Sequence, residues 1–302
     1  MKIYTLTLCP AYDVHAVAEN FTCGKENLVT VTSREAGGKG INISRALKSM
    51  GVETVAVVLL GEENSAEYET LIKKDRLSPV IIHTGGRIRE NLTIHHSGGE
   101  TRISHRGADA PSELVELLKS KISPAPCDIL TLTGRLPEGI TPRDLYPYLK
   151  ELRDSGIKLI IDSRSYGVED ISALRPWLIK PNREEIVEYV GENIDGLSEV
   201  VWYRDDLLSL GAENVLLTLD RDGAALITQN NTLTLHAPEV KVISTIGAGD
   251  SSIAGFIYAY VIGTELGEAL RYSVAFGSAA TLTDGTMPPR ADDIKRILKK
   301  LI

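Results

Sequence analysis

The sequence predicts an α/β fold: a doubly wound, mostly parallel sheet flanked by helices, with a small inserted β-sheet. Strand-like and helix-like segments alternate along most of the chain, the pattern that right-handed crossovers between parallel strands produce. Residues 52–60 are almost continuously apolar, as expected for a strand that is covered on both faces. Two excursions, about 10–35 and 86–107, interrupt the alternation and predict four short strands that form a lid.

The elements follow in order from the amino terminus. Alternating apolar and polar residues predict a first strand at 2–8 and a lid strand at 28–33. A helix should begin after the glycine-rich segment 37–40 and end at Gly51, since glycine adopts a left-handed cap at low cost. Further helices are predicted at 64–75, 111–122 and 141–155, strands at 79–83, 128–133, 158–162 and 177–180, and a lid hairpin at 88–96 and 101–105.

The last third of the chain contains strands first and helices afterwards. Strands are predicted at 214–219, 224–228 and 232–236, and the final 55 residues are mainly helical. One of these helices opens at Gly249-Asp250 and contains Gly255. A glycine inside a helix costs about 1 kcal/mol relative to alanine, so we expect Gly255 to pack closely against the sheet.

Composition narrows the class of protein. A chain of 302 residues with 43% hydrophobic and 25% charged residues is a soluble globular protein, expected here as a single domain, 1–302. The net charge of −8 argues against a binder of nucleic acid or anionic membranes. No signal peptide and no apolar run of about 20 residues is present. The three cysteines form no paired spacing, so a reducing cytoplasm is expected, without a disulfide framework or structural zinc.

The segment 244–256 carries the most informative motif. Glycines at 247 and 249, around Ala248, allow consecutive amide N–H groups to converge before a helix whose positive dipole end faces the same point. This arrangement would cradle a phosphate. Asp250 beside it would be repelled by phosphate unless it had a task, such as accepting a proton from an attacking hydroxyl. The alternative is an ordinary tight turn with an aspartate in the first helical turn.

Five ordered motifs run nearly the length of the chain: Pro10-Ala-Tyr-Asp13, Gly37-Gly-Lys-Gly-Ile-Asn42, Gly134-Arg-Leu-Pro137, Lys180-Pro-Asn-Arg-Glu-Glu185 and Thr245-Ile-Gly-Ala-Gly-Asp250. With these motifs the sequence resembles the ribokinase-like carbohydrate kinases, specifically the phosphofructokinase B (PfkB) branch. The resemblance implies an ATP- and Mg²⁺-dependent kinase that phosphorylates a ketohexose phosphate, with fructose 1-phosphate or fructose 6-phosphate as leading acceptors.

The resemblance also implies roles for residues on the nucleotide side. Asp250 would be the general base, and the amides of Gly247, Ala248 and Gly249 would form the anion hole. Asn182 and Glu185, with Asp162, would hold hydrated Mg²⁺; helix capping and surface charge are the alternative for Asn182 and Glu185. The nucleotide path would include a further three residues, Thr218, Asp220 and Gly223, where Asp220 replaces the usual glycine.

On the acceptor side, the resemblance assigns sugar-hydroxyl binding to Asp13 and Asn42, with Gly37 and Gly38 allowing close approach. Basic residues in the segments that would line or cover this cleft are Lys25, Lys39, Arg89, Arg106 and Arg135. Lys25 and Arg89 resemble the pair that grips a substrate phosphate.

Several positions depart from the family pattern. Cys9 stands for asparagine, Arg135 for serine, and Thr93 for a residue that is basic in some branches. Arg135 would bind phosphate or carboxylate, or alternatively pair with Glu138.

Other functions remain open at this stage. The alternatives are a kinase for tagatose 6-phosphate, a non-phosphorylated sugar or a nucleoside, or a catalytically weak sugar-phosphate-binding protein. A dinucleotide-dependent oxidoreductase is disfavoured because the first strand lacks G-x-G-x-x-G. A homodimer through the lid sheet is expected, since small exposed sheets are marginal alone.

Overall fold

The main sheet of the computed structural model, which describes residues 1–301, has nine strands in the order β13-β12-β11-β10-β9-β8-β1-β4-β5. The strands from β5 to β11 in this order run parallel, and β12 and β13 join antiparallel. The bounds are β1 (Ile3–Thr7), β4 (Val55–Gly61), β5 (Val80–Thr84), β8 (Ile129–Thr133), β9 (Lys158–Asp162), β10 (Leu178–Ile179), β11 (Asn214–Thr218), β12 (Ala224–Thr228) and β13 (Thr232–Leu235). The predicted doubly wound α/β sheet is confirmed.

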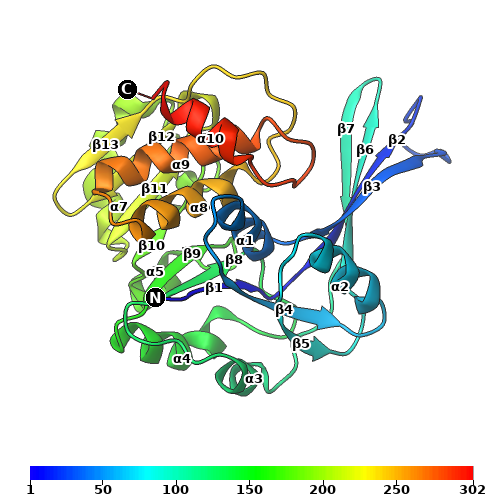
Figure 1. Ribbon diagram of the computed structural model, residues 1–302, viewed down its shortest axis with the longest axis horizontal. Coiled ribbons are helices and arrows are strands. Elements are labelled where there is room, and N and C mark those ends of the chain that lie inside the picture. The colour runs from blue at the N-terminus through cyan, green and yellow to red at the C-terminus, as the bar shows by residue number, and fades with distance from the viewer. Residues whose placement is uncertain (302) are drawn as a thin grey trace.

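Helices cover both faces of this sheet (Figure 1). One face carries α1 (Lys39–Ser49), α2 (Ser65–Lys74), α8 (Ala248–Val261), α9 (Leu266–Ala280) and α10 (Ala291–Leu298). The other carries α3 (Leu114–Lys121), α4 (Pro142–Asp154), α5 (Val168–Leu174), α6 (Ile186–Val190) and α7 (Arg204–Ser209), with short 3-10 turns at Leu197–Tyr203 and Asp220–Asp222. No helix within residues 1–301 is long and apolar enough to cross a bilayer.

The lid is a separate four-stranded sheet in the order β3-β2-β6-β7, as the two excursions predicted. Its strands are β2 (Ala11–Val17), β3 (Thr30–Gly37), β6 (Arg89–His96) and β7 (Gly99–Ser104). Figure 1 shows these strands projecting as an arm from the helix-covered body. Tyr12, Val14 and Ile88 at the root of the arm are buried against α2, which anchors the lid to one half of the molecule.

The interior of α8 corrects one expectation. A Cβ atom on Gly255 would lie 2.4 Å from the carbonyl oxygen of Tyr272 in α9. Gly255 therefore packs closely against a neighbouring helix, and the expectation that it packs against the sheet was wrong. A local pattern shows that a glycine needs a close neighbour, but it does not identify the neighbour.

The strand order creates a topological switch point between the neighbouring strands β1 and β8. β1 lies between β4 and β8, and the helices that follow β1 and β8 lie on opposite faces. In open α/β sheets, ligands bind in the crevice outside the carboxyl ends of the strands at such a point. A ligand-binding site is therefore expected among the residues that follow β1, β8, β9 and β10.

Candidate active site

Asp250 lies in the first turn of α8, with only 6% of its surface exposed. The Asn42 side chain, from α1, donates a hydrogen bond of 2.8 Å from Nδ2 to Asp250 Oδ2. Burial raises the pKa of Asp250 to about 6, against the opposing effects of Lys39 and of the Asn42 hydrogen bond. A carboxylate with this pKa is largely ionised at neutral pH and is suited to accept a proton.

The amide groups before Asp250 have the geometry of an anion cradle. Gly247 takes a left-handed conformation, with φ of +78°, that turns the chain into α8. The first amides of a helix have no intrahelical acceptor, and the helix dipole adds positive potential at the same place. The amide of Ala248 makes only a long bond of 3.3 Å to the Thr245 carbonyl. Gly247, Ala248 and Gly249 thus form the turn at the start of α8, and their role as an anion hole stays a prediction.

Two lysines, the buried Lys180 and the half-buried Lys39, flank this cradle. Lys39 Nζ lies 2.8 Å from Asp162 Oδ2, and Lys180 Nζ lies 3.6 Å from Asp162 Oδ1. A Cβ atom on Gly249 would lie 3.3 Å from Lys180 Nζ, so this ammonium group borders the cradle directly. Asp162 Oδ1 is buried and makes no hydrogen bond.

The charges of this cluster stabilise one another. Burial alone would raise the pKa of Asp162, but attraction to Lys180 and Lys39 outweighs burial and lowers it. Burial likewise opposes ionisation of Lys39, yet Asp162 and Asp250 raise its pKa. Lys39 is therefore charged, and Lys180 Nζ lies within ion-pair distance of the same Asp162 carboxylate. Lys180 was not predicted as a site residue, because a lysine after a strand is usually a solvated surface residue.

The lid carries Asp13 and Gly37, which were predicted to lie on the acceptor side of the site. Asp13 is 8% exposed, accepts a 2.8 Å hydrogen bond at Oδ1 from Asn91 Nδ2, and lies 3.7 Å from Arg102. A Cβ atom on Gly37 would lie 2.0 Å from Asp13 Oδ2, and one on Gly38 would lie 2.4 Å from a Thr7 methyl group. The two glycines therefore admit the close approach of Asp13 and Thr7, and the approach of a sugar to their backbone stays a prediction. Neither Asn91 nor Arg102 was predicted, because only the strand pairing places them beside Asp13.

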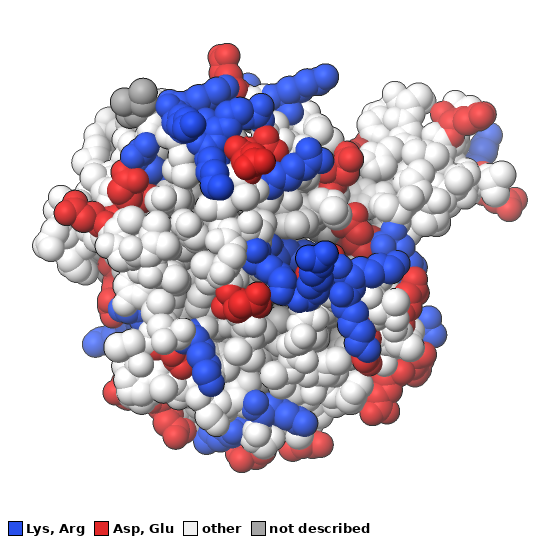
Figure 2. Space-filling model, in the orientation of Figure 1, with Lys and Arg blue, Asp and Glu red and all other residues white. Residues whose placement is uncertain are grey.

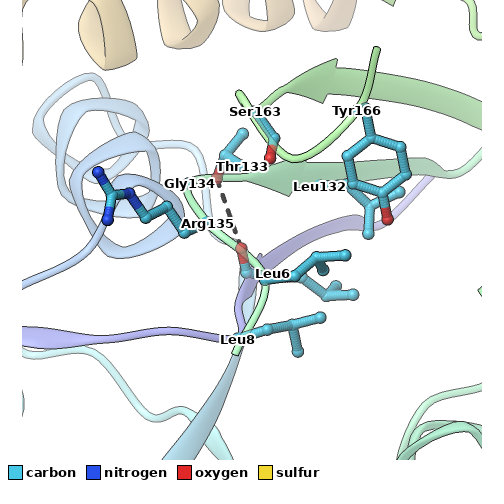
Figure 3. A pocket seen from close by; sticks show the side chains of 9 residues that line it. Leu6, Leu8, Leu132, Thr133, Gly134, Arg135, Ser163 and Tyr166 are labelled. Carbon is cyan, nitrogen blue, oxygen red and sulfur yellow. Dashed lines mark hydrogen bonds between the residues drawn. The ribbon is translucent and has the colours of Figure 1, made fainter. Parts of the chain in front are cut away.

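Arg89 and Arg135 both lie near Cys9. The Arg89 side chain bonds Asn91 at 3.0 Å, while its buried Nε has no partner. Burial raises the pKa of the Cys9 thiol, against the effects of Arg89 and Arg135. Figure 3 shows Arg135 at the edge of an apolar pocket, with its guanidinium directed away from Leu132 and Tyr166.

Arg135 is exposed and forms no ion pair within residues 1–301, so the alternative pairing with Glu138 is not observed there. Arg106 is also exposed. Lys25 lies in the loop between β2 and β3, at the outer end of the lid and at the opposite end of β2 from the root that holds Asp13 (Figure 1). A single chain therefore does not bring Lys25 to the other site residues.

Asn182 and Glu185 interact with each other at the turn before α6. Asn182 Oδ1 accepts the Glu185 amide at 2.8 Å, and Glu185 Oε2 accepts the Asn182 amide at 3.1 Å. Arg164 holds Glu185 Oε1 at 3.1 Å. This is the capping arrangement considered as the alternative, and it still leaves carboxylate and amide oxygens beside the residues that follow β9 and β10.

The remaining residues predicted on the nucleotide side lie at the end of β11 and after it. Thr218 pairs with Asn182 through an isolated β-bridge. Asp220 has a φ of +51° and lies 3.4 Å from Arg183. Gly223 has a φ of +116°, and a Cβ atom there would lie 2.1 Å from the Leu235 carbonyl oxygen. Asp220 thus takes a left-handed conformation, and its side chain is ion-paired with Arg183.

Comparison with known proteins agrees with this geometry. The model of the pfkB family carbohydrate kinases matches residues 3–293. A 1-phosphofructokinase from Borreliella burgdorferi is 31% identical over 98% of this chain and 96% of its own. One from Bacillus subtilis is 31% identical over 93% of each chain.

Among solved structures, phosphofructokinase-2 from Escherichia coli in complex with fructose-6-phosphate matches with a TM-score of 0.90 at 26% identity, over 99% of each chain. Fold, motif order and family model agree across the chain. The chain belongs to the pfkB family of carbohydrate kinases.

Proposed function

We propose that this protein transfers the γ-phosphoryl group of ATP to a hydroxyl of a ketohexose phosphate, with fructose 1-phosphate or fructose 6-phosphate as the acceptor and fructose 1,6-bisphosphate as the product. One observation carries the proposal. Asp250 is buried and titratable, lies directly after an amide cradle, and is hydrogen-bonded to Asn42 at 2.8 Å. A turn with a structural role only would not need a buried carboxylate that titrates near neutrality.

In the proposed reaction, the ionised Asp250 accepts the proton of the attacking acceptor hydroxyl. The amides of Gly247, Ala248 and Gly249 stabilise the negative charge of the phosphoryl group during transfer. Phosphoryl transfer is catalysed mainly by the positioning of the reactants and by electrostatic stabilisation, and the fixed amide donors would contribute to both.

Lys39 and Lys180 share the Asp162 carboxylate beside the cradle, so we assign them to the phosphate oxygens of ATP. Asp162 holds both ammonium groups in place in the free chain. Removing either lysine would leave the buried Asp162 carboxylate with less compensation.

The residues present fit a hydrated Mg²⁺ and do not fit a directly ligated metal. No three histidine, cysteine or acidic side chains converge as a metal site in the described part of the chain. Mg²⁺ usually keeps several waters and is held by one or two carboxylates together with substrate phosphates. Asn182, Glu185 and Asp162 would hold it in this way, and it would neutralise phosphate charge.

The acceptor is assigned to the lid side of the site. Asp13, Asn42 and the backbone at Gly37 and Gly38 would bind sugar hydroxyls. Arg89 and Arg135 would bind the phosphate already present on the sugar, because guanidinium groups bind phosphate oxygens in a bidentate manner. The matched relatives are named 1-phosphofructokinase, and a matched structure contains fructose-6-phosphate, which supports both acceptors as candidates.

We also propose a single cytoplasmic kinase domain, 1–302, that forms a homodimer through lids built from about 10–35 and 86–107. Val17, Leu28, Val31 and Ile103 of the lid region are between 42% and 92% exposed. Figure 2 shows that most of the lid surface in that view consists of uncharged side chains. A partner lid would cover these apolar groups and could bring Lys25 toward a site, which its own chain does not.

The direct test is Asp250→Asn. We expect a folded protein whose turnover with ATP and the preferred sugar phosphate falls by orders of magnitude, because the amide accepts no proton. Turnover equal to that of the unsubstituted protein would refute the assignment of the base. Light scattering at working concentration tests the dimer, and a monomeric mass would contradict it.

A further inference from the structure

The loop between α9 and α10, residues 281–290, lies against both halves of the proposed site. On one side, the Thr281 carbonyl accepts the amide of Ile243 at 2.8 Å and that of Ser244 at 3.4 Å. Ser244 and Ile243 begin the segment that leads into the phosphate cradle. The loop is thus hydrogen-bonded to the backbone on which the cradle is built.

On the other side, the same loop is bonded to the lid. Glu35 Oε2, on β3, accepts hydrogen bonds from the Thr286 hydroxyl at 2.5 Å and the Thr286 amide at 3.2 Å. Thr286 is only 4% exposed. A Cβ atom on Gly285 would lie 3.0 Å from Glu35 Oε1 and 3.2 Å from His15 Nε2, so these lid side chains pack directly on the loop backbone. We refer to the paired hydrogen bonds of Glu35 with Thr286 as the clasp.

Strand register connects the clasp with the acceptor side. Glu35 pairs with Asp13 across β2 and β3, and it precedes Gly37 by two residues on the same strand. The lid otherwise packs on α1 and α2. Within residues 1–301, the two bonds of the clasp are the hydrogen bonds that join lid strands to the chain beyond residue 240.

From this arrangement we infer that Glu35 is a positioning residue, which fixes the acceptor-binding lid at the correct distance from the phosphate cradle through the clasp with Thr286. The inference rests on the proposed phosphoryl transfer. Glu35 itself contacts neither Asp250 nor the cradle residues. Its effect is to hold Asp13, and any sugar bound there, in register with the base. Displacement of a reacting group by about 1 Å can lower a rate by about 100-fold, so a loose lid would be costly.

The first test compares Glu35→Ala with Glu35→Gln. Alanine removes both acceptor bonds, and we expect kcat/KM for the sugar phosphate to fall by about 10- to 100-fold. The KM for ATP should stay within about twofold, because the cradle and its lysines are untouched. Glutamine keeps an oxygen that can accept both bonds of Thr286, so it should restore most of the loss.

A matched control is available in the same loop. Asp284 is exposed and its side chain makes no hydrogen bond within residues 1–301, so Asp284→Ala should behave as the unsubstituted protein. Thr286→Val keeps the shape and the amide donor but removes the hydroxyl, and its effect should be smaller than that of Glu35→Ala. The double variant Glu35→Ala/Thr286→Val should lose no more than Glu35→Ala alone.

A second measurement is independent of activity. Hydrogen exchange of the Thr286 amide should be faster in Glu35→Ala than in Asp284→Ala, because its acceptor is gone. Unchanged exchange, an unchanged kcat/KM for the sugar phosphate, or a Glu35→Gln variant as impaired as Glu35→Ala would overturn the inference. If the unsubstituted protein phosphorylates no acceptor, the proposed function is wrong, and the exchange rates still decide whether the clasp exists.

Discussion

Replacement of Asp250 by asparagine should stabilise the protein while it abolishes activity. Asp250 is buried, and burial raises its pKa from 3.8 to about 6. A displacement of about 2 pH units corresponds to about 3 kcal/mol, which is the free energy by which the ionised carboxylate destabilises the native state at pH 7. Asparagine has nearly the same shape and can accept the hydrogen bond from Asn42, so Asp250→Asn should be more stable by about this amount at pH 7.

The size of this effect depends on pH. Below about pH 3, the carboxyl group is protonated in both the native and the unfolded chain, so the substitution should make little difference there. As the pH rises from about 4 to about 6, the unfolded chain ionises first, and the unsubstituted protein loses stability relative to the variant. Urea unfolding of both proteins at several pH values measures this difference. Equal stability at pH 7, or a difference that does not change with pH, would refute the reasoning.

Three further predictions concern the pH profile, the packing of α8 and the acceptor. The kcat/KM of the unsubstituted protein should fall below about pH 6, where Asp250 becomes protonated. Asn42→Ala should move this acidic limb of the pH profile upward by about one pH unit, since the carboxylate loses the hydrogen bond from Asn42. An acidic limb at the same pH in both proteins would argue against Asp250 as the base. Gly255→Ala places a methyl group 2.4 Å from the Tyr272 carbonyl oxygen and should lower the free energy of unfolding by about 1–3 kcal/mol; urea unfolding without any loss would contradict the packing. Arg135→Ala should raise the KM for the sugar phosphate at least about tenfold and leave that for ATP unchanged, and steady-state kinetics showing the reverse would remove Arg135 from the acceptor site.

The sequence predicted much of the fold because its local patterns are strong. The strands at 158–162 and 224–228 occur at the predicted residues, since both are short apolar runs between clear turns. The lid was predicted as two excursions, because its alternating segments interrupt a regular rhythm. The bounds of β2 and β3 were harder to predict, because the polar connection at residues 18–29 does not mark where β2 ends or where β3 begins.

The site was predictable only where its residues lie in one continuous motif. Gly247, Ala248, Gly249 and Asp250 are consecutive at the start of α8, so the sequence alone was enough to single them out. Lys180 joins the site only because β9 and β10 lie side by side, which brings its ammonium group to Asp162. Contacts of this kind depend on the packing of distant segments, and no local spacing records them.

The same limit applies to the clasp. Glu35 and Thr286 are 251 residues apart, and neither lies in a motif with a chemical signature. A glutamate near the end of a strand and a threonine in a loop are both ordinary surface residues in the sequence. Only the folded chain shows that they join the lid to the loop beside the cradle.

The most direct test of the central claim is to identify the product. The protein would be incubated with ATP, Mg²⁺ and each of several sugar phosphates, free sugars and nucleosides, and both ADP release and the phosphorylated product would be measured by phosphorus NMR. The account predicts one ADP for each fructose 1,6-bisphosphate formed from fructose 1-phosphate or fructose 6-phosphate, with little turnover of free sugars or nucleosides. ADP release that does not depend on any sugar phosphate, or product formed only from a free sugar or a nucleoside, would contradict it.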